Sequence, residues 1–161
     1  MSARRCRRIA LQKHYNMQPD ADYLISEVLK LVDEGREVYF TPQGNSMLPF
    51  IIGGVERVGL TQPKHICRGR VVLAHLPEGN YVIHRIIGIH GNDITLMGDG
   101  NLKYCEYCTR NDIKAEVSHL ITKDGKTKNF NTFPRRLAAL VWRILRPVRR
   151  WLLAAYRRLL L

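Results

Sequence analysis

Apolar residues follow helical spacing near the start of the chain. From Asp20 to Glu34 they recur every three or four positions, at Leu24, Val28, Leu31 and Val32. An aspartate, at position 20 or 22, can cap the N-terminus of this segment, and Gly35 is a plausible stop. The pattern therefore predicts one amphipathic helix over residues 20–34.

Residues 37–122 change to short apolar runs that are separated by turn residues, a pattern typical of β-strands. The predicted strands are Val38–Phe40, Val55–Leu60, Val71–Leu76, Tyr81–Ile89, Ile94–Met97 and Val117–Thr122. Glycine, asparagine, aspartate and proline gather between them, at Pro77–Asn80, His90–Asp93 and Gly98–Asn101. We therefore expect a mainly β fold that follows the N-terminal helix.

The segment 134–161 returns to helical spacing. Its apolar residues share one helical face: Leu137, Leu140, Val141, Ile144, Val148, Trp151, Leu152, Ala155 and Leu159. Arginines recur every seven residues on a neighbouring stripe, and Pro147 is expected to kink or split the helix. A basic amphipathic helix of this kind suits an anionic membrane surface. Packing of the apolar face on the body or on a partner chain is the alternative.

Charge separates the two ends of the chain from its middle. The chain has 26 Lys and Arg against 14 Asp and Glu, a net charge of +12. Residues 1–13 hold five of the basic residues, residues 134–161 hold eight arginines, and neither end holds an acidic residue. A near-neutral body with cationic ends is unlike a nucleic-acid-binding domain, whose positive stripe usually lies on the folded surface. We expect no specific nucleic-acid partner.

These patterns divide the chain into a basic arm (1–19), a body (20–133) and an Arg-rich tail (134–161). The basic N-terminus runs into polar residues rather than an apolar stretch, so we expect no signal peptide. No segment approaches the roughly 20 apolar residues that span a bilayer. The sequence thus predicts a cytoplasmic protein or one held peripherally at a membrane.

The four cysteines are too few and too scattered for a disulfide scaffold. Cys105 and Cys108 have the spacing of half a zinc site, which His119 or Cys67 would have to complete in space. Ordinary thiols in a reducing compartment are the better interpretation. We expect no metal and no cofactor.

The run from Thr41 to Ile51 has the features of a nucleophile loop. Gly44 permits a sharp approach of the chain to Ser46, and Pro49 stiffens the exit. Such a loop projects a hydroxyl and leaves nearby backbone N–H groups free for an oxyanion. Taken alone, the run is also compatible with an ordinary serine in an irregular loop.

Two later motifs follow in order: Tyr81–Gly88, which contains His84 and Arg85, and Leu96–Asn101, which contains Asp99. With the Gly-x-Ser-Met segment, they resemble the superfamily of signal peptidase I and the self-cleaving LexA-type repressors, over about residues 38–121. The resemblance implies that superfamily's compact, coiled β-sheet fold and a serine endopeptidase that acts on a peptide or protein substrate.

The resemblance also implies roles for individual residues. Ser46 matches the nucleophile, and His84 stands where bacterial members carry Lys and archaeal and endoplasmic-reticulum signal peptidases carry His. A neutral imidazole accepts a proton at neutral pH without the desolvation that a lysine base requires. Asp99 matches the acidic residue of the last motif, and it would either orient His84 or pair with Arg85.

Other residues of the serine loop would support the reaction or bind the substrate. Gly44 and Asn45 would support the oxyanion site, together with the backbone N–H of Ser46. The substrate would bind extended along a strand edge, with small residues in shallow pockets beside Met47, Pro49 and Phe50. The preference for small residues is implied by the resemblance alone.

The chain departs from the signal peptidases in two respects. They usually carry a serine two positions before the nucleophile, where this chain has Gly44, and they carry a membrane anchor, which we do not see here. Both departures argue against the cleavage of exported preproteins and leave peptide hydrolysis intact. Two other functions stay open: a non-catalytic binding module with cationic tails, and a LexA-like protein that cleaves only itself.

Overall fold

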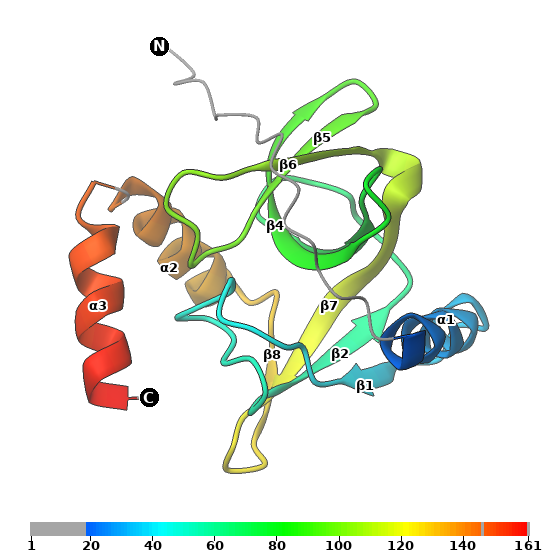
Figure 1. The fold of residues 1–161 in the computed structure, drawn as a ribbon, viewed down its shortest axis with the longest axis horizontal. Helices are drawn as coiled ribbons and strands as arrows, with labels where there is room; N and C mark the ends of the chain where they lie inside the picture. Colours follow the sequence, from blue (N-terminus) through cyan, green and yellow to red (C-terminus); the bar gives the residue numbers. More distant parts are fainter. Residues whose placement is uncertain (1–18, 146, 161) are drawn as a thin grey trace.

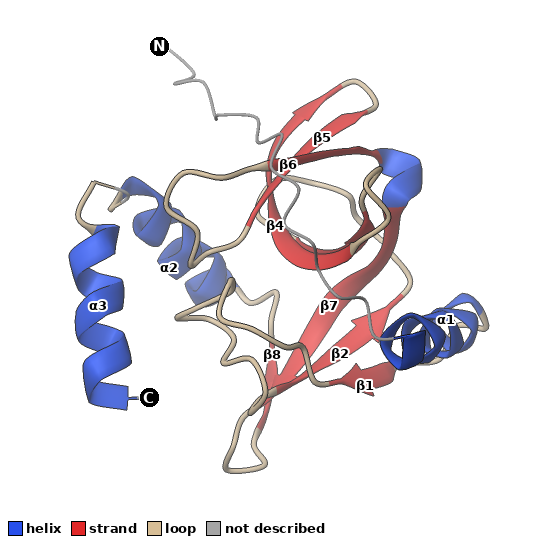
Figure 2. Ribbon diagram, viewed as in Figure 1, coloured by secondary structure: helices blue, strands red, loops and turns tan. Residues whose placement is uncertain are grey.

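The body is an antiparallel β-sheet with helices at both ends of the chain (Figures 1 and 2). The structure is a computed structural model that describes residues 19–145 and 147–160. The helices in this part are α1 (Pro19–Asp33), α2 (Phe133–Ile144) and α3 (Arg149–Leu160), with a short 3-10 helix, η1 (Arg110–Asp112). The strands are β1 (Val38–Phe40), β2 (Arg57–Thr61), β3 (Val71–His75), β4 (Tyr81–His90), β5 (Asp93–Met97), β6 (Glu106–Thr109), β7 (Ile113–Ile121) and β8 (Thr127–Asn129).

The strands of the described chain form one sheet in the order β1-β2-β7-β3-β4-β5-β6, and β8 pairs with β7. β4 is the long strand that curls through the centre of Figure 1. It pairs with β3 through Tyr81–Arg85 and with β5 through Arg85–His90. Because β4 changes partner at Arg85, its residues 81–84 keep one edge to which no described strand is bonded. The outer edge of β1, which pairs with β2, is likewise bonded to no strand of the described chain.

β3 is buried on both faces because the sheet coils around it. Val71 and Leu73 belong to a core that also contains Val32 of α1, whereas Val72 and Ala74 belong to a second core on the side of β5. Successive side chains of a strand point to opposite faces, so alternate residues of β3 pack into the first core and into the second core. The double burial explains why residues 71–74 are continuously apolar and do not alternate.

The mainly β fold and the N-terminal helix are confirmed, and each of the six predicted strands is present, with small shifts at the ends. β6, β8 and η1 were not predicted, because they are short and polar. β7 begins at Ile113 rather than at Val117. Polar residues interrupt the apolar pattern there, and one of them, Glu116, is buried against Arg70 with an N–O distance of 2.6 Å.

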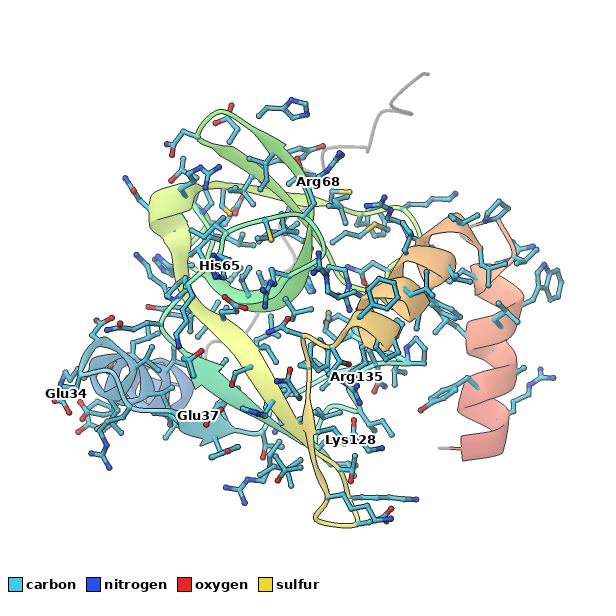
Figure 3. All side chains as sticks on the ribbon, turned by 180° about the vertical axis from the view of Figure 1, so that it is seen from behind. Glu34, Glu37, His65, Arg68, Lys128 and Arg135 are labelled. Carbon is cyan, nitrogen blue, oxygen red and sulfur yellow. The ribbon has the colours of Figure 1, made fainter. Side chains whose placement is uncertain are left out.

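The tail forms two helices that are separated by a turn at Pro147, in agreement with the expected break. One side of this α2–α3 hairpin packs on the body through buried Ala139, Arg149 and Leu153. Figure 3 shows Arg135 near the start of α2, beside the sheet, and its guanidinium lies 5.0 Å from the Phe130 ring centroid.

The predicted apolar face of the tail is not covered by the body. Its exposed large members in the described chain are Leu137, Leu140, Val141, Ile144, Val148, Trp151 and Leu152, and Phe133 and Leu145, which were not assigned to this face, are exposed as well. The side chain of Leu159 lies outside the described part. The hairpin therefore folds onto the body through its other side. No helix of the described chain has the length and the apolar character needed to cross a bilayer. The predicted basic arm lies outside the described residues except for Pro19, where α1 begins.

Two leucine truncations should separate the buried core from the exposed face of α2. Leu60→Ala opens a cavity at a fully buried position of β2, so we expect a loss of about 2–5 kcal/mol in the free energy of unfolding. Leu137→Ala removes the same atoms from a side chain that is 49% exposed and should cost less than about 1 kcal/mol. Urea unfolding followed by circular dichroism measures both. Similar losses would mean that the face of α2 is buried.

Candidate active site

Ser46 lies in the loop between β1 and β2, where Gly44 sets the course of the backbone. Gly44 has φ of 81°, in the left-handed region that favours glycine. After the serine, the Met47 carbonyl accepts hydrogen bonds from the backbone N–H groups of Phe50 (3.0 Å) and Ile51 (3.1 Å). The N–H of Ser46 donates to no acceptor among the described residues. It is therefore available to a developing oxyanion.

The turn Gly98–Asn101 presses against the backbone of this loop. The N–H of Gly100 donates a hydrogen bond of 2.7 Å to the Ser46 carbonyl oxygen. A Cβ atom on Gly98 would collide with that same oxygen, and one on Gly100 would lie 2.6 Å from the Asn45 carbonyl oxygen. Only glycine allows two backbones to approach so closely, which explains the composition of the turn.

His84 lies on the part of β4 that has an open edge, and its side chain is buried. Its Nδ1 is 2.9 Å from Oε2 of Glu106 in β6. A carboxylate only accepts, so Nδ1 carries the proton in this bond, and Nε2 of the neutral ring keeps a lone pair. A Cβ atom added to Gly98 would lie 3.0 Å from Nε2 of His84. The same added atom would also lie against the Ser46 carbonyl oxygen, so Nε2 and this oxygen are on the same side of Gly98. This end of the ring therefore faces the serine segment.

The strand register explains how Glu106 reaches the histidine. Ile86 in β4 pairs with Leu96 in β5, and Leu96 pairs with Glu106 in β6. Paired residues point to the same face of a sheet, and so do residues two apart on one strand. His84, two residues before Ile86, therefore shares a face with Glu106.

Ser46, His84 and Glu106 line one cavity of about 580 Å³. The cavity lies between the loop after β1 and the open edge of β4, and most of its surface is apolar. The other residues that line it are Ile25, Phe40, Pro42, Gln43, Gly44, Met47, Ile51, Gly53, Leu73, Leu76, Asn80, Tyr81, Val82, Ile83 and Asn101. In the described chain no hydrogen bond joins the Ser46 hydroxyl to the His84 ring, although both residues line this cavity.

Asp99 pairs with Arg85 and not with the histidine, which decides between the two roles left open above. Nε of Arg85 donates to Oδ1 (2.9 Å) and Oδ2 (3.1 Å), and its Nη2 donates to Oδ2 (2.6 Å). Nη1 of Arg85 donates to the Gly69 carbonyl oxygen at 2.6 Å. Both charged side chains are buried, so this bidentate pair ties β4 to the turn that contacts Ser46.

The other predicted residues divide between the cavity and its surroundings. Met47 lines the cavity and is buried, and Gly44 lines it with its backbone. Asn45 is exposed and contributes its carbonyl to the contact with Gly100. Pro49 and Phe50 are not among the residues that line this cavity, and their assignment to the substrate pocket stays a prediction. The Phe50 ring instead forms an edge contact with Trp142, with a centroid distance of 6.4 Å.

Glu106 is the residue of the candidate site that the sequence did not indicate. It lies between Cys105 and Cys108, where cysteine spacing draws attention, and no motif of the resemblance contains it. Its position in a short polar strand is the local signal. A polar residue in a strand does not reveal its hydrogen-bond partner. The register of β4, β5 and β6 determines that the Glu106 carboxylate contacts His84 rather than another described histidine.

The expectation of ordinary thiols is wrong for Cys105, which is disulfide-bonded, whereas Cys67 and Cys108 are free. Cys105 is thus not available as a thiolate ligand in the half zinc site. The part of the chain that the structure describes holds no group of three or more His, Cys, Asp or Glu side chains placed to bind a metal ion.

Comparison with protein-family models, with curated proteins and with solved structures finds no match to this chain. The chemistry that the site can perform follows from its own groups. They are a hydroxyl, an imidazole whose Nδ1–H is held by a carboxylate, and an N–H free for an oxyanion. Groups of these three kinds act in enzymes as a nucleophile, a general base and an electrostatic stabiliser.

Removing the buried charge of Asp99 should destabilise the fold. We expect Asp99→Asn to lower the free energy of unfolding by about 3 kcal/mol or more, because the Arg85 charge stays buried without its ionic partner. Glu27→Gln, which breaks the exposed pair with Lys30, should cost less than about 1 kcal/mol. Urea unfolding of the two variants measures the difference. Equal small losses would show that the Arg85–Asp99 pair is not important for stability.

The thiol of Cys108 should resist alkylation in the folded protein. Burial, with the nearby Asp112 and Glu106 carboxylates, raises the pKa of Cys108 from 9.0 to about 11. At pH 8 its thiolate fraction is then roughly a hundredfold lower than at the ordinary pKa. With iodoacetamide and peptide mass spectrometry, we expect Cys67 to react first, and Cys108 to react as the pH rises toward 11 or after unfolding. Equal rates at pH 8 would contradict this.

Proposed function

We propose that the protein is a serine endopeptidase in which Ser46 is the nucleophile, His84 the general base and Glu106 the group that positions the histidine. One observation carries the proposal: the imidazole, held at Nδ1 by Glu106, lines the same cavity as Ser46 and turns Nε2 toward the serine segment. The resemblance of the Ser46, His84 and Asp99 motifs to signal peptidase I and the LexA-type repressors supports the same function.

In the proposed reaction, Nε2 of His84 takes the proton from Oγ of Ser46 as Oγ attacks the peptide carbonyl. The Glu106 carboxylate stabilises the positive charge that the ring gains. The backbone N–H of Ser46 donates to the oxyanion. The imidazolium then returns its proton to the leaving amine, and water, activated by the same base, hydrolyses the ester.

The hydrogen bond between the hydroxyl and the imidazole would form when the substrate binds. Catalytic hydrogen bonds are often long or poorly aligned in free enzymes and tighten in the complex. The surrounding parts are already held in place: Gly100 binds the Ser46 carbonyl oxygen, and Glu106 holds the ring. Formation of the hydrogen bond between the Ser46 hydroxyl and the His84 imidazole would therefore be a local change.

The substrate would bind as an extended chain in the cavity between the loop after β1 and residues 81–84 of β4. The open edge of β4 offers backbone groups to such a chain, as in strand addition. Phe40, Met47 and Ile83 make the walls apolar, which suits uncharged side chains beside the cleaved bond. The preference for small residues rests on the resemblance.

Substitutions at the three positions test the proposal on a peptide library with mass-spectrometric detection. We expect Ser46→Ala and His84→Ala each to lower kcat/KM on the order of 10³-fold or more. Glu106→Gln should lower kcat on the order of 100-fold and leave KM nearly unchanged, because a positioning residue acts on the chemical step. Thermal unfolding identifies variants that fail to fold.

The chain contains a matched control outside the cavity. Oε1 of Glu37, the residue labelled near α1 in Figure 3, lies 2.5 Å from the Ser118 hydroxyl and 2.7 Å from Nδ1 of His119. Ser118→Ala, His119→Ala and Glu37→Gln remove the same three kinds of group and should leave turnover intact. Equal cleavage by wild type, Ser46→Ala and His84→Ala would overturn the proposal. Cleavage confined to the chain's own backbone would identify a self-cleaving protein instead.

A further inference from the structure

The outer face of the α2–α3 hairpin presents large apolar side chains to solvent. Phe133 is 77% exposed, Ile144 is 70% exposed and Trp151 is 67% exposed. On α2, residues 133, 137, 140, 141 and 144 follow helical spacing and form one stripe. Exposed apolar side chains continue at Leu145, Val148 and Leu152. A group of exposed large apolar side chains of this kind marks an interaction site more often than a free surface.

Positive charge accompanies this face without any negative charge. Arg136 and Arg143 are exposed on α2, and Arg150 is exposed on α3. The guanidinium of Arg150 lies 4.9 Å from the Trp151 ring centroid, so a cation and an aromatic ring occupy one place on the surface. Residues 134–161 contain no acidic residue. The partner of this face should therefore combine an apolar interior with an anionic surface.

The opposite side of the hairpin provides its attachment to the body. Nε1 of Trp142 donates to the Asp99 carbonyl oxygen at 2.8 Å, and Nη1 of Arg149 donates to the Asn101 carbonyl oxygen at 2.9 Å. Arg149 is 3% exposed and Leu153 is 4% exposed. Folding thus uses one side of each helix and leaves the apolar side free.

We propose that the α2–α3 hairpin docks the protein on an anionic lipid bilayer. The exposed apolar stripe would enter the boundary between headgroups and acyl chains, and the arginines would pair with anionic headgroups. Charge complementarity favours lipid, because an anionic bilayer offers negative charge and hydrocarbon across one extended surface. Since Trp142 and Arg149 bind the turn that contains Asn101, a cavity residue, the docked hairpin would lie between the bilayer and this turn. This inference is independent of whether Ser46 is a nucleophile.

Vesicle co-sedimentation with the full chain tests how much the arginines contribute to bilayer binding. We expect wild type to bind vesicles that contain phosphatidylglycerol, to bind pure phosphatidylcholine weakly, and to dissociate as salt is raised. The triple variant Arg136→Gln, Arg143→Gln, Arg150→Gln should lose about fivefold in the partition coefficient per arginine, on the order of 100-fold in total. The control is Lys123→Gln, Lys126→Gln, Lys128→Gln, which removes three exposed charges near β8 and should bind more tightly than the arginine variant.

A second pair of variants tests how much the exposed apolar side chains contribute to bilayer binding. Ile144→Ser with Trp151→Ser should weaken binding about tenfold or more, whereas Val55→Ser with Tyr104→Ser, at exposed positions of the body, should bind like wild type. Circular dichroism verifies that each variant is folded. Ser46→Ala should bind vesicles like wild type, so a failed peptidase test and a failed docking test can be told apart.

Three results would overturn the proposal. The first is equal binding by the arginine and lysine variants, which would reduce the effect to net charge. The second is a stable dimer in sedimentation analysis that the Ile144 and Trp151 substitutions abolish, because the face would then belong to a second copy. The third is tight binding to duplex DNA together with no binding to anionic vesicles.

Discussion

The close approach of the Gly98–Asn101 turn to the Ser46 loop is the constraint on which the site depends. These segments are far apart in the sequence, and their backbones meet because Gly98 and Gly100 have no side chains at the contact. The buried pair of Arg85 and Asp99 holds the turn from the other direction. If the turn moved, the Ser46 carbonyl oxygen would lose its bond to Gly100, and the serine would lose its place beside the imidazole.

Strand β4 supplies two neighbouring side chains with different tasks. His84 points toward the cavity and meets Glu106, whereas Arg85, on the opposite face, binds Asp99 and lies 5.3 Å from the Phe50 ring centroid. The alternation of side chains along a strand makes this division possible. A buried ion pair stabilises the site's framework on one face, and the other face presents the histidine to the cavity. The proposed peptidase mechanism requires both.

The α2–α3 hairpin shows a similar division between its two sides. The side with Trp142 and Arg149 completes the fold around the turn at Asp99. The outer side leaves its apolar groups in water, which is unfavourable in a protein with no partner for them. A bilayer would remove that cost, and the surrounding arginines would determine which lipids are bound. In the proposed arrangement, the same hairpin stabilises the site and positions it at a membrane.

The sequence by itself determined the helix at 20–34, six of the strands and the break at Pro147, because these follow from local spacing and from residues with special backbone preferences. The motifs also indicated Ser46 and His84 as a pair. Only the tertiary structure decided that Glu106 meets His84, that Asp99 binds Arg85, and that the apolar side of the tail stays exposed. The physical reason is that these contacts depend on strand register and on the packing of distant segments, which local spacing does not record.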